Sequence, residues 1–270
     1  MADQGSFGDS VSLAASFEER SKEQLIDTVA MACRVLGKSN MTKEPSGHVS
    51  CRSSDSGFVV RGRGRDEVGL SFTSSEQIVE CDFSGNSQSA LGLAAPIEVF
   101  IHSSIYRARS DVRSVVHVHP ANLVALTICD IPLEPIYGAY DPTSARLAAK
   151  GIPTFRSSCL IGTDELGDEL AEVLDDASAV LLRGHGLVTV GNTVEEATVN
   201  AVRVSQLADM TFKVKLLGGG STISDGEISE LLSPAVRSGD SRSYQSVWRY
   251  LCNSSGETLP RFPSKVITSE

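Results

Sequence analysis

The sequence predicts an α/β protein with one domain around a central mixed or antiparallel sheet. β-type segments rich in branched and aromatic residues arrive in pairs in the first half of the chain, and they alternate with helical patterns in the second half. The 270 residues would fit one large domain or two small ones, but no repeat or linker-like stretch divides them. We therefore expect a single domain.

The first half begins with a tail and a helix and continues with strands. Residues 1–16 are polar and rich in Gly and Ser, so we expect a flexible tail ahead of a domain over 17–270. Apolar residues at helical spacing predict a helix over 18–37, which a glycine ends. Three β-type segments follow, at 47–52, 57–61 and 78–83. Pro96 is expected at the first position of the next helix, which carries Glu98.

The second half alternates helices with strands. Helices are predicted over 122–129, 143–150, a segment capped by Thr163 or Asp164, and about 194–217. Strands are predicted over 152–156, 179–183 and 187–190. A C-terminal extension from about residue 222 holds a short helix at 227–232 and a 244–251 segment with the only tryptophan. We interpret this extension as a cap on the core, with pocket lining or contact with a neighbouring subunit as alternatives.

Composition excludes several classes of protein. The formal net charge of −10 argues against nucleic acid as a partner, because phosphate binding needs a basic surface. No apolar run approaches the roughly 20 residues of a membrane span, and the N-terminus has no signal-peptide pattern. The six cysteines are scattered, which favours reduced, mostly buried thiols over a disulfide framework. A cytoplasmic protein is expected, and a small anionic substrate remains possible where arginines cluster.

Three of the five histidines have the pattern of one metal site. His117 and His119 end an apolar β-branched run, so their side chains point to the same face of a strand. His185 lies between two glycines, where the backbone can turn tightly and approach another strand. Neutral imidazoles suit Zn, Fe, Cu or Ni, and three of them leave a position open for substrate. The alternative is that each is a hydrogen-bonded core histidine.

Glu98 precedes His117 by 19 residues and could complete the coordination sphere or act as acid and base beside the metal. Taken alone, it would be a glutamate that stabilises a helix N-terminus. His102, one helical turn later, is interpreted as a supporting or core residue.

In order and spacing, these motifs closely resemble those of the class II aldolase/adducin family over roughly residues 20 to 220. The matching segments are Gly47-His48-Val49-Ser50, Glu98-x-x-x-His102, Tyr106 to Val112, Val115 to Pro120, and Arg183-Gly184-His185-Gly186. The resemblance implies a three-layer α/β/α domain with a mostly antiparallel nine-stranded sheet. It also implies a homotetramer with active sites at subunit interfaces. Metal ligands would be His117, His119 and His185, with Glu98 as catalytic acid/base or displaceable fourth ligand.

Departures from the family pattern point to its decarboxylase-like branch. Sugar-phosphate enzymes of the family carry two serines before the glutamate, where this chain has Pro96-Ile97, and an asparagine where it has His48. The phosphate cradle is therefore largely missing. The segment Arg61-Gly62-Arg63-Gly64-Arg65 could instead pair with a carboxylate, or be a solvated basic loop. This segment, the motif around His48, Gly138 to Asp141 and the motif at Arg183 together resemble the dihydroxyphthalate-type decarboxylases. They also resemble aminocoumarin-antibiotic enzymes that form prenylated hydroxybenzoates.

The resemblance implies a carbon–carbon lyase acting on an aromatic hydroxy or oxo acid. One Fe(II) or Zn(II) ion per subunit would chelate the substrate and stabilise the enolate-like charge left by CO2. Glu98 would relay a proton, with His48 or Tyr140 nearby, and Arg61, Arg63 and Arg183 would bind the carboxylate. Three alternatives remain. They are oxidative decarboxylation of a hydroxyphenylpyruvate-type acid by iron and O2 in antibiotic biosynthesis, an aldolase on a non-phosphorylated substrate, and a non-enzymatic adducin-like scaffold.

Overall fold

The computed structural model describes residues 20–65, 67–89, 91–233 and 240–259, with the backbone alone for 240–243. The predicted 1–16 tail lies outside these residues. One sheet crosses the molecule in the strand order β4-β3-β2-β1-β5-β8-β7-β6. Its strands are β1 His48–Arg52, β2 Gly57–Arg61, β3 Ile78–Asp82, β4 Ser87–Gln88, β5 Ser114–Val118, β6 Thr154–Phe155, β7 Ala179–Leu182 and β8 Gly186–Gly191. All neighbouring strands are antiparallel except the parallel pair β6–β7, which confirms the mostly antiparallel sheet.

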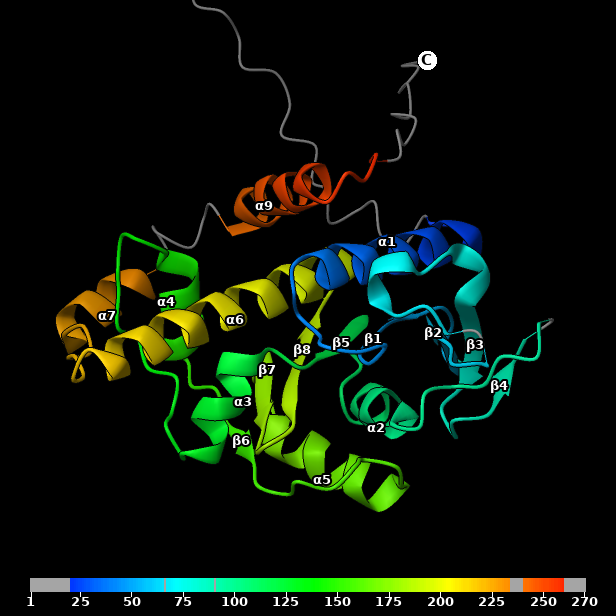
Figure 1. Ribbon diagram of the computed structural model, residues 1–270, viewed down its shortest axis with the longest axis horizontal. Coiled ribbons are helices and arrows are strands. Elements are labelled where there is room, and N and C mark those ends of the chain that lie inside the picture. Colours follow the sequence, from blue (N-terminus) through cyan, green and yellow to red (C-terminus); the bar gives the residue numbers. More distant parts are fainter. Residues whose placement is uncertain (1–19, 66, 90, 234–239, 260–270) are drawn as a thin grey trace, which may run out of the picture.

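Helices cover both faces of the sheet, so the predicted three layers are present (Figure 1). They are α1 Lys22–Lys38, α2 Val99–Ala108, α3 Ala121–Ile128, α4 Pro142–Ala149, α5 Asp164–Leu174, α6 Val194–Leu216, α7 Asp225–Leu231 and α9 Asp240–Ser254, with short 3₁₀ helices at Leu70–Phe72 and Ser75–Gln77. Helices α1 and α6 pack on one face, and α2 and α5 on the other. Among the described residues no helix is long and apolar enough to cross a membrane.

Alternation along the strands divides the core into two apolar clusters. Val116 and Val118 of β5 belong to the cluster under α1 and α6. Val115 of the same strand belongs to the cluster under α2 and α5, because successive strand side chains point to opposite faces. His117 has the parity of Val115, so it lies on the α2 side of the sheet.

Two sequence predictions are corrected. The described residues form eight strands, not nine; beyond β2, pairing continues only as an isolated bridge between Arg63 and Ala94. Glycines flank Arg63 and a proline follows Ala95, which disfavours a longer ladder there. Pro96 does not open α2. Its carbonyl accepts the Val99 N–H in a turn, and the helix begins at Val99 with Glu98 as its N-cap.

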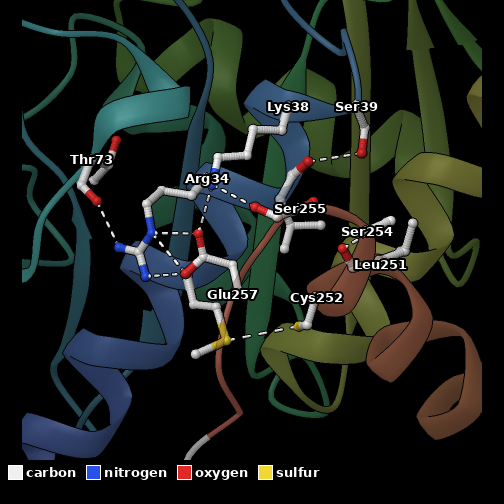
Figure 2. A network of polar contacts seen from close by, with 11 residues as sticks. Arg34, Lys38, Ser39, Thr73, Leu251, Cys252, Ser254, Ser255 and Glu257 are labelled. Carbon is white, nitrogen blue, oxygen red and sulfur yellow. Dashed lines mark hydrogen bonds and ion pairs between the residues drawn. The ribbon is translucent and has the colours of Figure 1, made fainter.

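The C-terminal helix α9 packs on α1 and α6 through Trp248, Leu251 and Cys252, which are all buried. Figure 2 shows how the residues after α9 are tied to α1. The Arg34 guanidinium donates to both carboxylate oxygens of Glu257 at 2.6 to 2.9 Å. Lys38 donates to the Ser255 carbonyl at 2.6 Å. These contacts favour the interpretation of this region as a cap on the core.

Candidate metal centre

Two of the predicted ligands lie at the end of β5. His117 is completely buried, and its Nδ1 lies 3.1 Å from the Leu187 carbonyl oxygen. A carbonyl only accepts, so this nitrogen carries the proton and Nε2 keeps its lone pair. His119 follows the strand, with Nδ1 3.0 Å from the Ser46 hydroxyl. The Nε2 atoms of the two histidines are 2.9 Å apart, so both rings present this nitrogen to one point.

The third imidazole comes from the turn between β7 and β8. Gly184 adopts φ +63°, a conformation that favours glycine, and the His185 N–H bonds back to the Leu182 carbonyl. At Gly186 a Cβ atom would lie 2.5 Å from the Val118 carbonyl oxygen and 2.7 Å from the His119 ring. Both glycines are therefore needed, one for the turn and one for the close approach. The His185 ring lies 4.9 Å from that of His117, measured between centroids.

The Glu98 carboxylate approaches the three histidines from the start of helix α2. It is the N-cap of α2, yet its side chain makes no capping hydrogen bond. Instead Oε2 lies 3.5 Å from Nε2 of His117, and Oε1 lies 3.5 Å from Nε2 of His185. Oε1 also accepts the Ile161 N–H at 3.0 Å. The carboxylate is therefore held in place by the backbone and faces the histidines.

The four residues have the arrangement expected of a metal site. Glu98, His117, His119 and His185 each offer one ligand atom, and these atoms all lie within 4.8 Å of one another. Three imidazole nitrogens and one carboxylate oxygen are a donor set that suits zinc or iron. The outer nitrogens of His117 and His119 are hydrogen-bonded, as is usual for metal-bound histidines. The residues present therefore fit a transition metal.

The electrostatics of the cluster favour a neutral His119 imidazole beside an ionised Glu98 carboxylate. Burial, followed by the neighbouring His117 and His185, lowers the pKa of His119 to about 3. Burial alone would raise the pKa of Glu98, but the neighbouring His117 and His185 outweigh it and hold that pKa far below its ordinary value. At neutral pH His119 and Glu98 are thus in the unprotonated form that metal binding requires.

His48 lies beside the cluster but is not one of the grouped ligand residues. It is buried, it pairs with His117 across β1 and β5, and the two ring centroids are 5.0 Å apart. Its Nδ1 lies 2.6 Å from Nε2 of His102 on α2. His102 therefore supports His48 rather than joining the cluster, in line with its interpretation as a supporting residue.

The predicted arginines occupy three different environments. Arg61 is buried, ion-paired with Glu67 at 2.6 Å, and donates to the Gly47 carbonyl at 3.1 Å. Arg63 is exposed, and its Nε donates to the Ala95 carbonyl at 2.9 Å. Arg183 is partly exposed, with Nε 3.7 Å from the Asp130 carboxylate. The structure therefore separates the three, and Arg183 adjoins the turn that carries His185.

Tyr140 is not brought to the cluster within this chain. It is 77% exposed, just before α4, and its ring contacts that of Tyr137. In the part of the chain that the structure describes, it has no hydrogen bond or ring contact with the four grouped residues.

The sequence did not predict the groups that form hydrogen bonds with the grouped side chains and fix their orientation. Ser46, Ile161 and the Leu187 carbonyl each fix one of the grouped side chains. It also missed that His48 and Ser50 contact His102 and Tyr106. Alternation along β1 and the four-residue spacing on α2 were the available signals, but neither shows which helix covers which strand.

Fold and site together define an α/β protein with a three-histidine, one-glutamate centre, and comparison with known proteins identifies its family. Residues 27–212 match the class II aldolase and adducin N-terminal domain. The chain belongs to this family.

Individual relatives agree with this assignment. A 3,4-dihydroxyphthalate decarboxylase from Arthrobacter keyseri is 35% identical over 83% of this chain and 91% of its own length. The protein of the same name from Rhodococcus jostii is 35% identical over 71% and 80%. An L-fuculose 1-phosphate aldolase structure from Glaciozyma antarctica PI12 superimposes with a TM-score of 0.71 at 18% identity, covering 92% of this chain and 100% of that one. This last likeness concerns the fold alone.

Proposed function

We propose that this protein is a metal-dependent decarboxylase of an aromatic hydroxy acid of the dihydroxyphthalate type. The observation that carries the proposal is the convergence of Glu98, His117, His119 and His185 on one point in a chain 35% identical to a dihydroxyphthalate decarboxylase. His117, His119 and His185 would hold one Zn(II) or Fe(II) ion. Such an ion supplies Lewis-acid polarisation of the substrate oxygens.

Glu98 is proposed to move the proton. Its carboxylate is ionised and is fixed by the Ile161 N–H, so it can accept a proton from the substrate hydroxyl. It would return that proton to the ring carbon from which CO2 has left, and the phenolate would take one proton from solvent. His48 lies opposite His117 and is proposed to contact the same substrate.

Arg63 and Arg183 are proposed to bind the substrate carboxylate. Arg63 is exposed and anchored at the Ala95 carbonyl, on the segment that leads to Glu98. Arg183 adjoins the turn of His185 and is only loosely paired at 3.7 Å with Asp130. Arg61 would have to leave Glu67 to do the same, so we assign it to support of Gly47, directly before His48.

A homotetramer with active sites at subunit interfaces remains part of the proposal. Tyr140 is largely exposed on its own subunit, so we place its catalytic role at a site completed by a neighbouring copy.

The alternatives have less support. Pro96-Ile97 lies where sugar-phosphate enzymes of the family carry two serines, which disfavours a phosphorylated aldol substrate. The grouped ligands argue against a non-enzymatic scaffold. The oxidative reaction and a role in antibiotic biosynthesis have no support among the relatives described above.

Turnover with a small set of acids tests the proposal. We expect zinc- or iron-loaded protein to release one CO2 per 3,4-dihydroxyphthalate, at the same rate with and without oxygen. L-Fuculose 1-phosphate, assayed as a control, should not be cleaved. Cleavage of the sugar phosphate without CO2 release from any aromatic acid would replace the decarboxylase with an aldolase. Strict dependence on oxygen would restore the oxidative alternative.

A further inference from the structure

A continuous chain of polar side chains runs from α2 to the edge of the metal centre. His48 and Ser50 share one face of β1, while His102 and Tyr106 lie one turn apart on α2. The Tyr106 hydroxyl lies 2.6 Å from Ser50 Oγ, and Ser50 Oγ lies 2.6 Å from Nδ1 of His102. Nε2 of His102 lies 2.6 Å from Nδ1 of His48. All four side chains are buried, and each finds a hydrogen-bond partner within this set, as buried polar groups require.

The two ends of the chain differ. At one end, the Tyr106 hydroxyl has Ser50 as its only side-chain partner among the described residues. Its surroundings include the Phe58 and Phe83 rings, and burial holds the pKa of Tyr106 well above its ordinary value, so the phenol keeps its proton. At the other end, Nε2 of His48 has no hydrogen-bond partner in the part of the chain that the structure describes. That ring faces His117.

These ends determine the direction of every hydrogen bond between them. Burial lowers the pKa of His102 to about 3, so this ring is neutral and carries one proton. If Tyr106 donates to Ser50, Ser50 must donate to Nδ1 of His102. The His102 proton is then on Nε2 and is donated to Nδ1 of His48. The His48 proton is left on Nε2.

The opposite direction is disfavoured. It would have His48 donate to His102, His102 to Ser50 and Ser50 to Tyr106, and it would leave the Tyr106 proton without an acceptor in an aromatic environment. Each direction leaves one donor without a partner among the described residues: the Tyr106 hydroxyl between the Phe58 and Phe83 rings, or the His48 Nε2–H beside His117. A donor enclosed by aromatic rings carries its full desolvation cost, whereas one at the metal centre can donate to a substrate. The forward direction places the only unused N–H at the metal centre, where a substrate can accept it.

We infer that Tyr106, Ser50 and His102 are positioning residues that fix His48 as an Nε2–H donor to the substrate oxygen on which negative charge develops. The inference rests on the proposed function for the identity of that substrate, but the proton positions do not. A fixed donor at such an oxygen stabilises the transition state without reorganisation. Under this inference, Glu98 transfers the proton and His48 only donates a hydrogen bond.

Nitrogen-15 solid-state NMR of the zinc-loaded protein with labelled histidine rings tests the proton positions directly. The chain has five histidines, so the His48→Asn and His102→Gln variants suffice to assign the two signals. We expect Nε2 protonated and Nδ1 unprotonated in both rings. A proton on Nδ1 of His48 would overturn the inference. In Tyr106→Phe we expect both tautomers of His48, and an unchanged spectrum would remove Tyr106 from the chain.

Kinetics of two matched variants test the positioning role. The His102→Gln carboxamide can still donate to Nδ1 of His48, whereas His102→Leu cannot. We expect kcat of the leucine variant to fall about 10- to 100-fold with KM and zinc content little changed, and the glutamine variant to recover most of it. Equal loss in both variants would contradict the role. The correct tautomer in a protein inactive on every aromatic acid would uphold the proton positions and reject the proposed function.

Discussion

His48 and His117 lie directly opposite each other on β1 and β5, with their ring centroids 5.0 Å apart. Residues paired in this way share a face of the sheet, so β1 adds an imidazole beside the cluster that β5 begins. One of the two rings is fixed by α2 and the other by the β8 carbonyl of Leu187. The sheet thus sets two different histidine environments side by side.

Gly186→Ala should displace the His119 ring and the adjoining backbone of the metal centre. The added methyl group would meet the Val118 carbonyl at 2.5 Å and the His119 ring at 2.7 Å. We expect about 1–3 kcal/mol of lost stability from overpacking and weaker zinc binding, measured by thermal unfolding and competition with a chelator. Gly138→Ala is the control, because nothing lies within 4 Å of its added Cβ. Equal behaviour of the two variants would contradict this account of the turn.

Glu98→Gln should abolish proton transfer while leaving the folded structure intact. The amide oxygen can still accept the Ile161 N–H, so we expect the melting temperature to change little. Without a group that can carry the proton, kcat should fall by about 10²- to 10⁴-fold. CO2 release by the zinc-loaded variant is the measurement. A variant that retains near wild-type kcat would remove Glu98 from the chemistry.

The buried histidines should make stability depend on pH. An unfolded histidine takes a proton near pH 6.5, whereas His102 in the folded protein does so only near 3. Between these values the unfolded state binds more protons, so the free energy of unfolding falls as the pH falls, by about 1.4 kcal/mol per pH unit for each such histidine. Urea unfolding of metal-free protein measures it. In His102→Gln, the change in unfolding free energy per pH unit should be smaller by about 1.4 kcal/mol, the contribution of one histidine. An unchanged pH dependence would show that His102 does not contribute.

The ion pair between α1 and the C-terminal residues should contribute to stability. Glu257→Gln removes the charge that Arg34 and Lys38 contact, and we expect a loss of about 1–2 kcal/mol, since the Arg34 pair is bidentate and partly buried. Glu80→Gln, which breaks the exposed pair with Lys22, should cost less than about 1 kcal/mol. Urea unfolding compares them. The account of α9 as a docked cap fails if both variants match the parent chain.

Much of the fold and the grouping of Glu98 with the three histidines could be predicted from local patterns. Alternation along a strand puts His117 and His119 on the same face. The glycines around His185 allow a tight turn that approaches another strand. The start of α2 could not be predicted, because Pro96 suits both a first helical position and the turn observed. Nor could the pairing of Arg61 with Glu67, or the contact of His48 with His102, because both depend on how distant segments pack.

Metal titration with CO2 release as the readout tests the central claim most directly. Chelator-treated protein should be inactive on 3,4-dihydroxyphthalate, and activity should rise with added Zn(II) or Fe(II) to a plateau at one ion per chain. His119→Ala should bind the ion weakly and stay inactive. Full CO2 release by metal-free protein, or by His119→Ala, would contradict the assignment of Glu98, His117, His119 and His185 as the catalytic metal centre.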